Sequence, residues 1–145
     1  MRPVWADTIL YAERQHLLRL ILWGGSSIIA ATAVVTTMSL RRIRSPLLTH
    51  FAAQTAAWGT IVGIIAGIEL NAATMRDLSG AARLERLLWM NVGLDAGYVA
   101  IGVVLAAFSW VAAKKLSGVG AGAGIVVQGL ALLVIDLQFA SVISR

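Results

Sequence analysis

Two aspartates, Asp95 and Asp136, lie inside long apolar runs of the sequence. An ionisable side chain is energetically expensive in the hydrocarbon region of a membrane, so each aspartate is a candidate for a functional role. Asp95 follows Arg86 by nine residues, and Asp136 precedes Arg145 by nine residues. At the helical rise, each aspartate lies roughly 13 Å in from a basic residue on the same membrane side. We therefore expect the two carboxyl groups to lie at similar depth and to meet.

Other polar side chains fall near these aspartates. Asn91, Asp95 and Tyr98 share one helix face, and Gln128 precedes Asp136 by about two helical turns. The predicted intramembrane polar cluster consists of Asn91, Asp95, Tyr98, Gln128, Asp136 and Arg19. Two interpretations remain open. The cluster is an interhelical contact satisfied by Arg19 and backbone groups, or it binds a proton or a cation, because two nearby carboxylates cannot both ionise cheaply.

A second polar spot consists of His50, Gln54 and Trp58, one helical turn apart in the second apolar run. Packing is one interpretation, and binding of a haem, pigment or quinone is the other. His16 precedes the first run, about 30 Å from His50 across the membrane, so the two histidines cannot ligate one haem together. The sequence has no HExxH, CxxC, GxSxG or phosphate-loop motif. We expect no enzyme, no metal site and no cofactor.

The composition is that of a membrane protein. Of 145 residues, 59% are hydrophobic and 13% are charged, whereas soluble domains carry about 25% charged residues. Four apolar runs, about 20–40, 48–70, 87–113 and 121–143, are each long enough to cross ~30 Å of hydrocarbon. They lack the period-two alternation of barrel strands. The predicted fold class is an all-α membrane protein, a four-transmembrane-helix bundle in one domain, 1–145.

The segments between the runs predict the topology. Residues 3–18 have mixed polarity at helical spacing, which predicts a short helix that lies in the interface or extends the first span. Residues 72–86 form a long polar loop that we expect to hold a short surface helix, and Trp23 is expected to contact lipid at a membrane face. Four spans place both termini on one side. The two short loops carry five basic residues and no acid, which favours a cytoplasmic position for them.

Small residues recur at four-residue spacing in the spans. Such spacing lets helix backbones approach closely in lipid. The predicted packing glycines are Gly59, Gly63, Gly67, Gly93 and Gly97. They pack within one bundle, or the second span presents them to another copy of the chain. In either case a bulky side chain at Gly63 is expected to force helices apart.

The polar motifs also carry a resemblance. They read Asn91-x-Gly93-Leu94-Asp95-x-x-Tyr98, then Gln128-Gly129, then Leu133-x-x-Asp136. This pattern resembles an uncharacterised family of small bacterial four-helix integral membrane proteins, and the segment from His50 to Trp58 is similar to that family's second helix. The resemblance implies the four-helix topology. It implies no activity, substrate or cofactor.

Three functional hypotheses follow. The first is a non-enzymatic accessory, scaffold or interaction subunit in a bacterial inner membrane, as a homo-oligomer or within a larger membrane complex. The second is a small homo-oligomeric transporter or channel that uses Asp95 and Asp136. The third is a binder of haem, pigment or quinone. The formal charge of +5 does not indicate nucleic acid, because the basic residues lie at span ends, where they contact the lipid bilayer.

Overall fold

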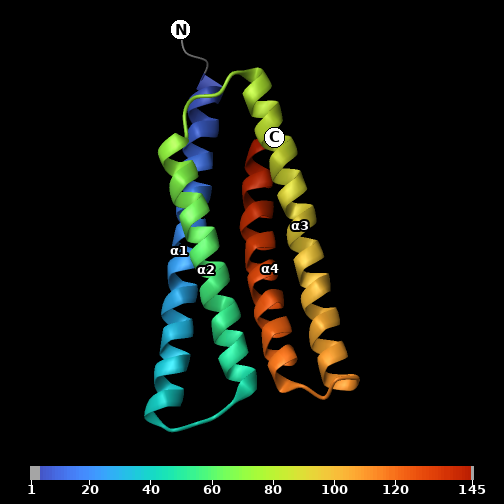
Figure 1. The fold of residues 1–145 in the computed structure, drawn as a ribbon. Coiled ribbons are helices and arrows are strands. Elements are labelled where there is room, and N and C mark those ends of the chain that lie inside the picture. Colours follow the sequence, from blue (N-terminus) through green and yellow to red (C-terminus); the bar gives the residue numbers. More distant parts are fainter. Residues whose placement is uncertain (1–3, 145) are drawn as a thin grey trace.

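The computed structural model describes residues 4–144, and these form four long helices (Figure 1). They are α1 (Val4–Leu40), α2 (Pro46–Ala72), α3 (Leu78–Val111) and α4 (Leu116–Ile143). No strand occurs in this part of the chain. Each helix is long and apolar enough to cross a membrane. The predicted all-α class with four spans is confirmed.

Two helices begin earlier than the predicted spans. The mixed-polarity segment before the first span is the beginning of α1, so it extends that span and does not form a separate helix. The polar segment predicted as a loop with a surface helix is instead mostly the first part of α3, and the connection shortens to residues 73–77. Asp77 starts α3 early because its Oδ1 accepts a 2.7 Å hydrogen bond from the Gly80 N–H.

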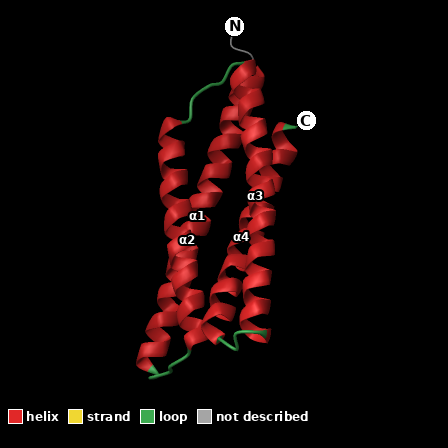
Figure 2. Cartoon of the chain, turned by 45° about the vertical axis from the view of Figure 1, so that its right-hand side comes forward, coloured by secondary structure: helices red, strands yellow, loops and turns green. Residues whose placement is uncertain are grey.

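Two short connections lie together at the other end of the bundle (Figure 2). In the first, Ser45 caps α2 by accepting a hydrogen bond from the Leu48 N–H, and Pro46 occupies the first helical turn. Each connection contains one basic residue in the left-handed backbone region, Arg42 with φ 52° and Lys114 with φ 53°. Across these turns, α1 packs against α2 and α3 packs against α4 as antiparallel neighbours.

The helix α4 lies at the centre of the packing. It contacts each of the other three helices, and α2 and α3 pack against α4 rather than against each other along their length (Figure 1). A Cβ added to Gly102 of α3 would lie 2.8 Å from the carbonyl oxygen of Gly122, and one on Gly124 would lie 3.0 Å from the Gln54 Cβ. The glycines of α4 therefore allow its backbone to approach two neighbours closely.

The predicted packing glycines divide into two groups. Gly59 lies at the crossing of α1 and α2, where an added Cβ would be 2.7 Å from the carbonyl oxygen of Gly24. A Cβ on Gly63, Gly67, Gly93 or Gly97 would meet nothing within 4 Å. The expectation for Gly63 therefore needs correction. Its backbone lies near Gly24, but a side chain at Gly63 would point into open space and would not force α1 and α2 apart.

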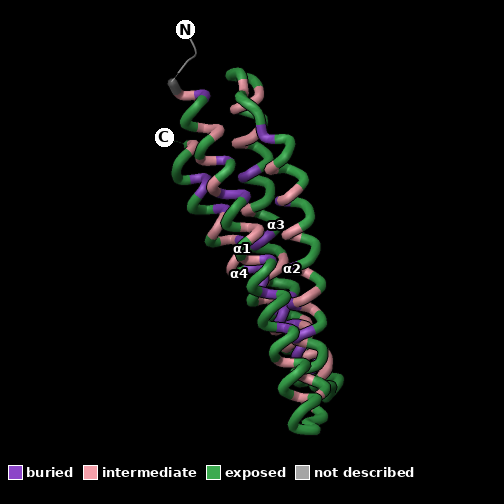
Figure 3. Tube along the Cα trace, turned by 90° about the vertical axis from the view of Figure 1, so that its left-hand side faces the viewer, coloured by how far each residue is buried: buried purple, intermediate pink, exposed green. Residues whose placement is uncertain are grey.

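The outer surface of the bundle is apolar. Large hydrophobic side chains are exposed along the helices, among them Leu22 at 71%, Ile29 at 71% and Val104 at 66%. Buried positions lie along the inside of the bundle, and exposed positions cover its outside (Figure 3). Exposed apolar area on this scale is typical of a surface that contacts lipid or a partner.

Candidate functional site

Asp95 and Asp136 meet in one cavity. Asp95 comes from α3 and Asp136 from α4, both residues are 5% exposed, and both line a cavity of about 270 Å³. All four helices contribute to its wall. We call this space the aspartate cavity. Its other polar or aromatic lining residues are His16, Trp58, Glu69, Asn91 and Tyr98.

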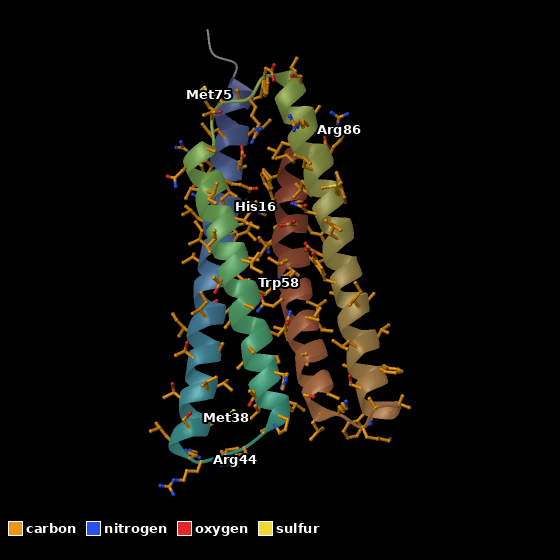
Figure 4. The ribbon with its side chains drawn as sticks, viewed as in Figure 1. His16, Met38, Arg44, Trp58, Met75 and Arg86 are labelled. Carbon is orange, nitrogen blue, oxygen red and sulfur yellow. The ribbon has the colours of Figure 1, made fainter. Side chains whose placement is uncertain are left out.

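The partner of Asp136 is His16 of α1. The His16 Nε2 lies 3.5 Å from the Asp136 Oδ1, and the imidazole stacks on the ring of Phe139 with a centroid distance of 4.5 Å. The position of His16 along the bundle is labelled in Figure 4. Arg19, which the sequence suggested as the partner, instead donates a 3.1 Å hydrogen bond to the Gln138 Oε1 at an exposed position. The long arginine side chain reaches the bundle surface, whereas the shorter histidine stays inside.

Asp95 has an unsatisfied oxygen. Within residues 4–144, its buried Oδ2 accepts no hydrogen bond, and the buried Nδ1 of His16 also lacks a partner. Buried polar atoms in proteins nearly always have hydrogen-bond partners, so an exception calls for an explanation. Asp95 lines the aspartate cavity, and a proton on its carboxyl group, or a cation close to it, would compensate the buried charge.

The charges around the cavity are unbalanced. Its lining contains three carboxyl side chains, those of Glu69, Asp95 and Asp136, and no lysine or arginine. Glu69 is exposed, whereas the two aspartates are buried. The described part of the chain has no group of three His, Cys, Asp or Glu residues placed to hold a metal ion.

Two aromatic rings separate the aspartate cavity from a second one. Trp58 of α2 and Tyr98 of α3 meet edge to face, with ring centroids 5.0 Å apart and planes at 78°. Both also line a smaller cavity of about 160 Å³, together with Gln54. The predicted second polar spot is thus divided. Gln54 and Trp58 share this cavity, whereas the exposed His50 lies apart, its Nδ1 2.8 Å from the carbonyl oxygen of Pro46.

Gln128 belongs to a different contact from the aspartates. Its Oε1 accepts a 2.8 Å hydrogen bond from the Trp23 indole N–H, and its Nε2 donates a 3.1 Å bond to the Ser27 Oγ. Gln128 is 1% exposed, so these bonds fix α4 against α1 inside the bundle. Trp23, expected at a membrane face, therefore has its polar atom directed inward.

A third cavity lies beside the aspartate cavity, toward the end of the bundle where α1 begins. It has a volume of about 190 Å³ and shares His16, Glu69 and Asn91 with the aspartate cavity. Its outer part is formed by a bidentate ion pair that sequence reasoning missed. Arg76 donates from Nη2 to the Glu13 Oε1 at 2.6 Å and from Nε to Oε2 at 3.0 Å.

This ion pair ties the connection between α2 and α3 to α1. The hydrogen bonds that Arg76 donates to the Glu13 carboxylate raise the pKa of Arg76 above its usual value, so the guanidinium stays charged. The sequence offered no signal for the pair, because its members are 63 residues apart and each resembles an ordinary surface charge.

The model of a family of unknown function, DUF6992, matches residues 19–137. The chain belongs to this family. The predicted resemblance to an uncharacterised family is thereby confirmed. The DUF6992 match includes Asp95, Asp136, Trp58 and Tyr98, and it begins three residues after His16. No curated protein and no solved structure matches the chain.

Proposed function

We propose that this member of DUF6992 is a small membrane transporter or channel in which Asp95 and Asp136 bind a proton or a cation. One observation carries the proposal. Two buried carboxyl groups from different helices share a cavity whose lining has no lysine or arginine. A contact that served only to hold helices together would pair its polar atoms, as Gln128 does. Asp95 leaves an oxygen unpaired.

The chemistry of the site supports reversible binding of positive charge. A carboxylate in a region of low dielectric is stabilised by a proton or by a nearby cation, and two adjacent carboxyl groups titrate as a coupled pair. His16 contacts Asp136 on one side and lines the cavity that reaches the Glu13–Arg76 ion pair on the other. The order of these groups, from the aspartates through His16 to the Glu13–Arg76 ion pair, supports a path for positive charge to one end of the bundle.

Flux measurements test the proposal. The full chain is reconstituted in liposomes that hold a pH-sensitive dye, and proton flux is followed under an imposed gradient with and without Na⁺ or K⁺. We expect flux above that of empty liposomes, and we expect Asp95→Asn and Asp136→Asn each to abolish it. Asp7→Asn is the matched control, because Asp7 is exposed and lies outside the aspartate cavity.

Two outcomes would contradict this function. The first is wild-type flux equal to that of empty liposomes. The second is unchanged flux in both aspartate variants, each shown to be folded by its elution volume and thermal unfolding in detergent.

An accessory or scaffold role is a second candidate, favoured by the open glycine faces. Gly67 on α2 and Gly97 on α3 have no neighbour within 4 Å of an added Cβ, and such small-residue faces accept a partner helix in lipid. The mass of the chain purified in mild detergent separates a homo-oligomer from a larger complex. No observation favours haem, pigment or quinone binding, since His50 contacts its own helix.

We also propose a bacterial inner membrane as the location, with the two short connections in the cytoplasm. The support is the charge of those connections. They contain Arg41, Arg42, Arg44, Lys114 and Lys115 and no acidic residue. Basic residues in short loops near span ends favour the cytoplasmic side.

A further inference from the structure

We propose that the substrate of the aspartate cavity is a small amphipathic organic cation, an ammonium group that carries an apolar or aromatic substituent. This inference rests on the proposed function and names its substrate class. The molecule enters sideways from the membrane, between α2 and α3. Its ammonium group contacts Asp95, and its apolar part lies against Trp58 and the cavity mouth.

The first feature that favours this substrate is the opening of the cavity. The helices α2 and α3 pack on α4 rather than on each other, and both contribute lining residues to the aspartate cavity. Three apolar lining side chains are half exposed, Ile61 at 47%, Ile65 at 50% and Leu94 at 50%. The cavity therefore opens toward the apolar outer surface, where a ligand dissolved in lipid would meet it first.

The second feature is the negative charge of the buried aspartate. Asp95 is 5% exposed and lines the cavity. Its Oδ2 has no hydrogen-bond partner within the described chain. No lysine or arginine lines the cavity to neutralise it. A buried carboxylate without a lysine or arginine partner attracts an ammonium group in the cavity, and a quaternary ammonium pairs with it by charge alone.

The third feature is the aromatic wall of the cavity, which favours an organic cation over a bare ion. Trp58 and Tyr98 both line the cavity, and tryptophan is the ring that attracts cations most strongly. A proton or a metal ion would use neither ring nor the apolar mouth. The volume of about 270 Å³ is just below the range of about 300–1,000 Å³ for drug-sized ligands, which favours a small molecule.

The test compares a cation with a neutral molecule of the same shape. The probe is benzyltrimethylammonium, and the neutral isostere is neopentylbenzene, in which carbon replaces the ammonium nitrogen. Binding to the full chain in mild detergent is measured by titration calorimetry. We expect saturable binding of the cation and none of the isostere. Asp95→Asn should abolish binding, and Trp58→Leu should weaken it by about tenfold. Trp110→Leu, at an exposed tryptophan outside the cavity, is the matched control and should bind as the wild type does.

The outcomes separate this inference from the function on which it rests. Equal binding of cation and isostere would show an apolar site and overturn the inference, and this contrast needs only the wild-type chain if a variant does not fold. No binding of the cation, in a chain that shows aspartate-dependent proton or metal-ion flux, would overturn the organic substrate and leave the proposed function in place. Asp95-dependent binding without any flux would support the cation site and contradict transport.

Discussion

Gln128 and Asp95 are both buried polar side chains inside apolar helices, and they differ in what their polar atoms contact. Gln128 bonds Trp23 and Ser27 across the α1–α4 interface. Asp95 lines a cavity, and its buried Oδ2 has no hydrogen-bond partner in the described chain. Polar residues in spans are either interhelical contacts or parts of a substrate path. The hydrogen-bond partners assign Gln128 to the first class and place Asp95 as a candidate for the second.

Outside the spans, Asp77 gives a pH-dependent prediction at the residue scale. Hydrogen bonds from the Gly80 N–H and the Ser79 hydroxyl lower the pKa of Asp77 below its usual value. A lowered pKa in the folded state means that the capping contribution is complete above the unfolded value of about 3.9. It is lost as the pH falls through the lower, folded value.

The measurement compares Asp77→Ala with the wild type. We expect the variant to have a lower thermal unfolding temperature at pH 7, because the first turn of α3 loses its cap. The difference should shrink as the pH is lowered below the usual aspartate range. The amide chemical shift of Gly80 should titrate in the same range in the wild type alone. A difference between the proteins that grew toward low pH would contradict the assignment.

At the scale of elements, the crossing of α1 and α2 depends on Gly24 and Gly59. A Cβ on Gly24 would lie 2.5 Å from the carbonyl oxygen of Gly59, and the contact is backbone against backbone, which cannot move aside. We expect Gly59→Leu to destabilise the bundle by about 1–3 kcal/mol or more, as overpacking does. Thermal unfolding in detergent measures this.

The control for that variant is Gly67→Leu on the same helix. An added Cβ at Gly67 meets nothing within 4 Å, so the leucine points to the open surface. Its unfolding temperature should match the wild type, and any loss of a homo-oligomer would identify this face as the contact between copies. If both variants unfolded at the same temperature, the placement of Gly59 against α1 and of Gly67 on the open surface would be wrong.

At the scale of the whole molecule, two hairpins are joined through one helix. The α1–α2 hairpin meets the α3–α4 hairpin mainly through α4. As a result, α2 and α3 do not pack closely on each other beside the aspartate cavity. The Glu13–Arg76 ion pair holds the connection between α2 and α3 at one end, and the Trp58–Tyr98 contact joins the same two helices further along. A cavity that holds two carboxyl groups results from this incomplete closure.

The same arrangement predicts the topology in the membrane. Ser45 and Ser117 lie at the end of the bundle with the two short connections, and Ser79 lies at the other end (Figure 1). Reporter fusions at Ser45 and Ser117 should therefore report the same side, and a fusion at Ser79 should report the opposite side. Opposite signals from Ser45 and Ser117 would exclude four spans. The basic short connections predict the cytoplasm for the first pair.

The sequence by itself determined the helices and the depth of the aspartates. Apolar runs of fixed length can only be helices in a membrane, and the constant rise per residue set Asp95 and Asp136 at one level. The first residues of α1 and α3 were harder to predict from the sequence. Polar first turns look like loops when hydropathy alone is read, and the cap at Asp77 shows its role only in the folded backbone.

Only the tertiary structure decided which faces meet. Periodicity identifies the residues that share a helix face, but the rotation of each helix about its axis depends on packing against distant segments. For that reason His16 rather than Arg19 lies beside Asp136, and Gln128 bonds Trp23 away from the aspartates. Gly59 touches α1 while Gly67 stays open for the same reason. Each of these outcomes depends on contacts between residues far apart in the chain, which no local spacing encodes.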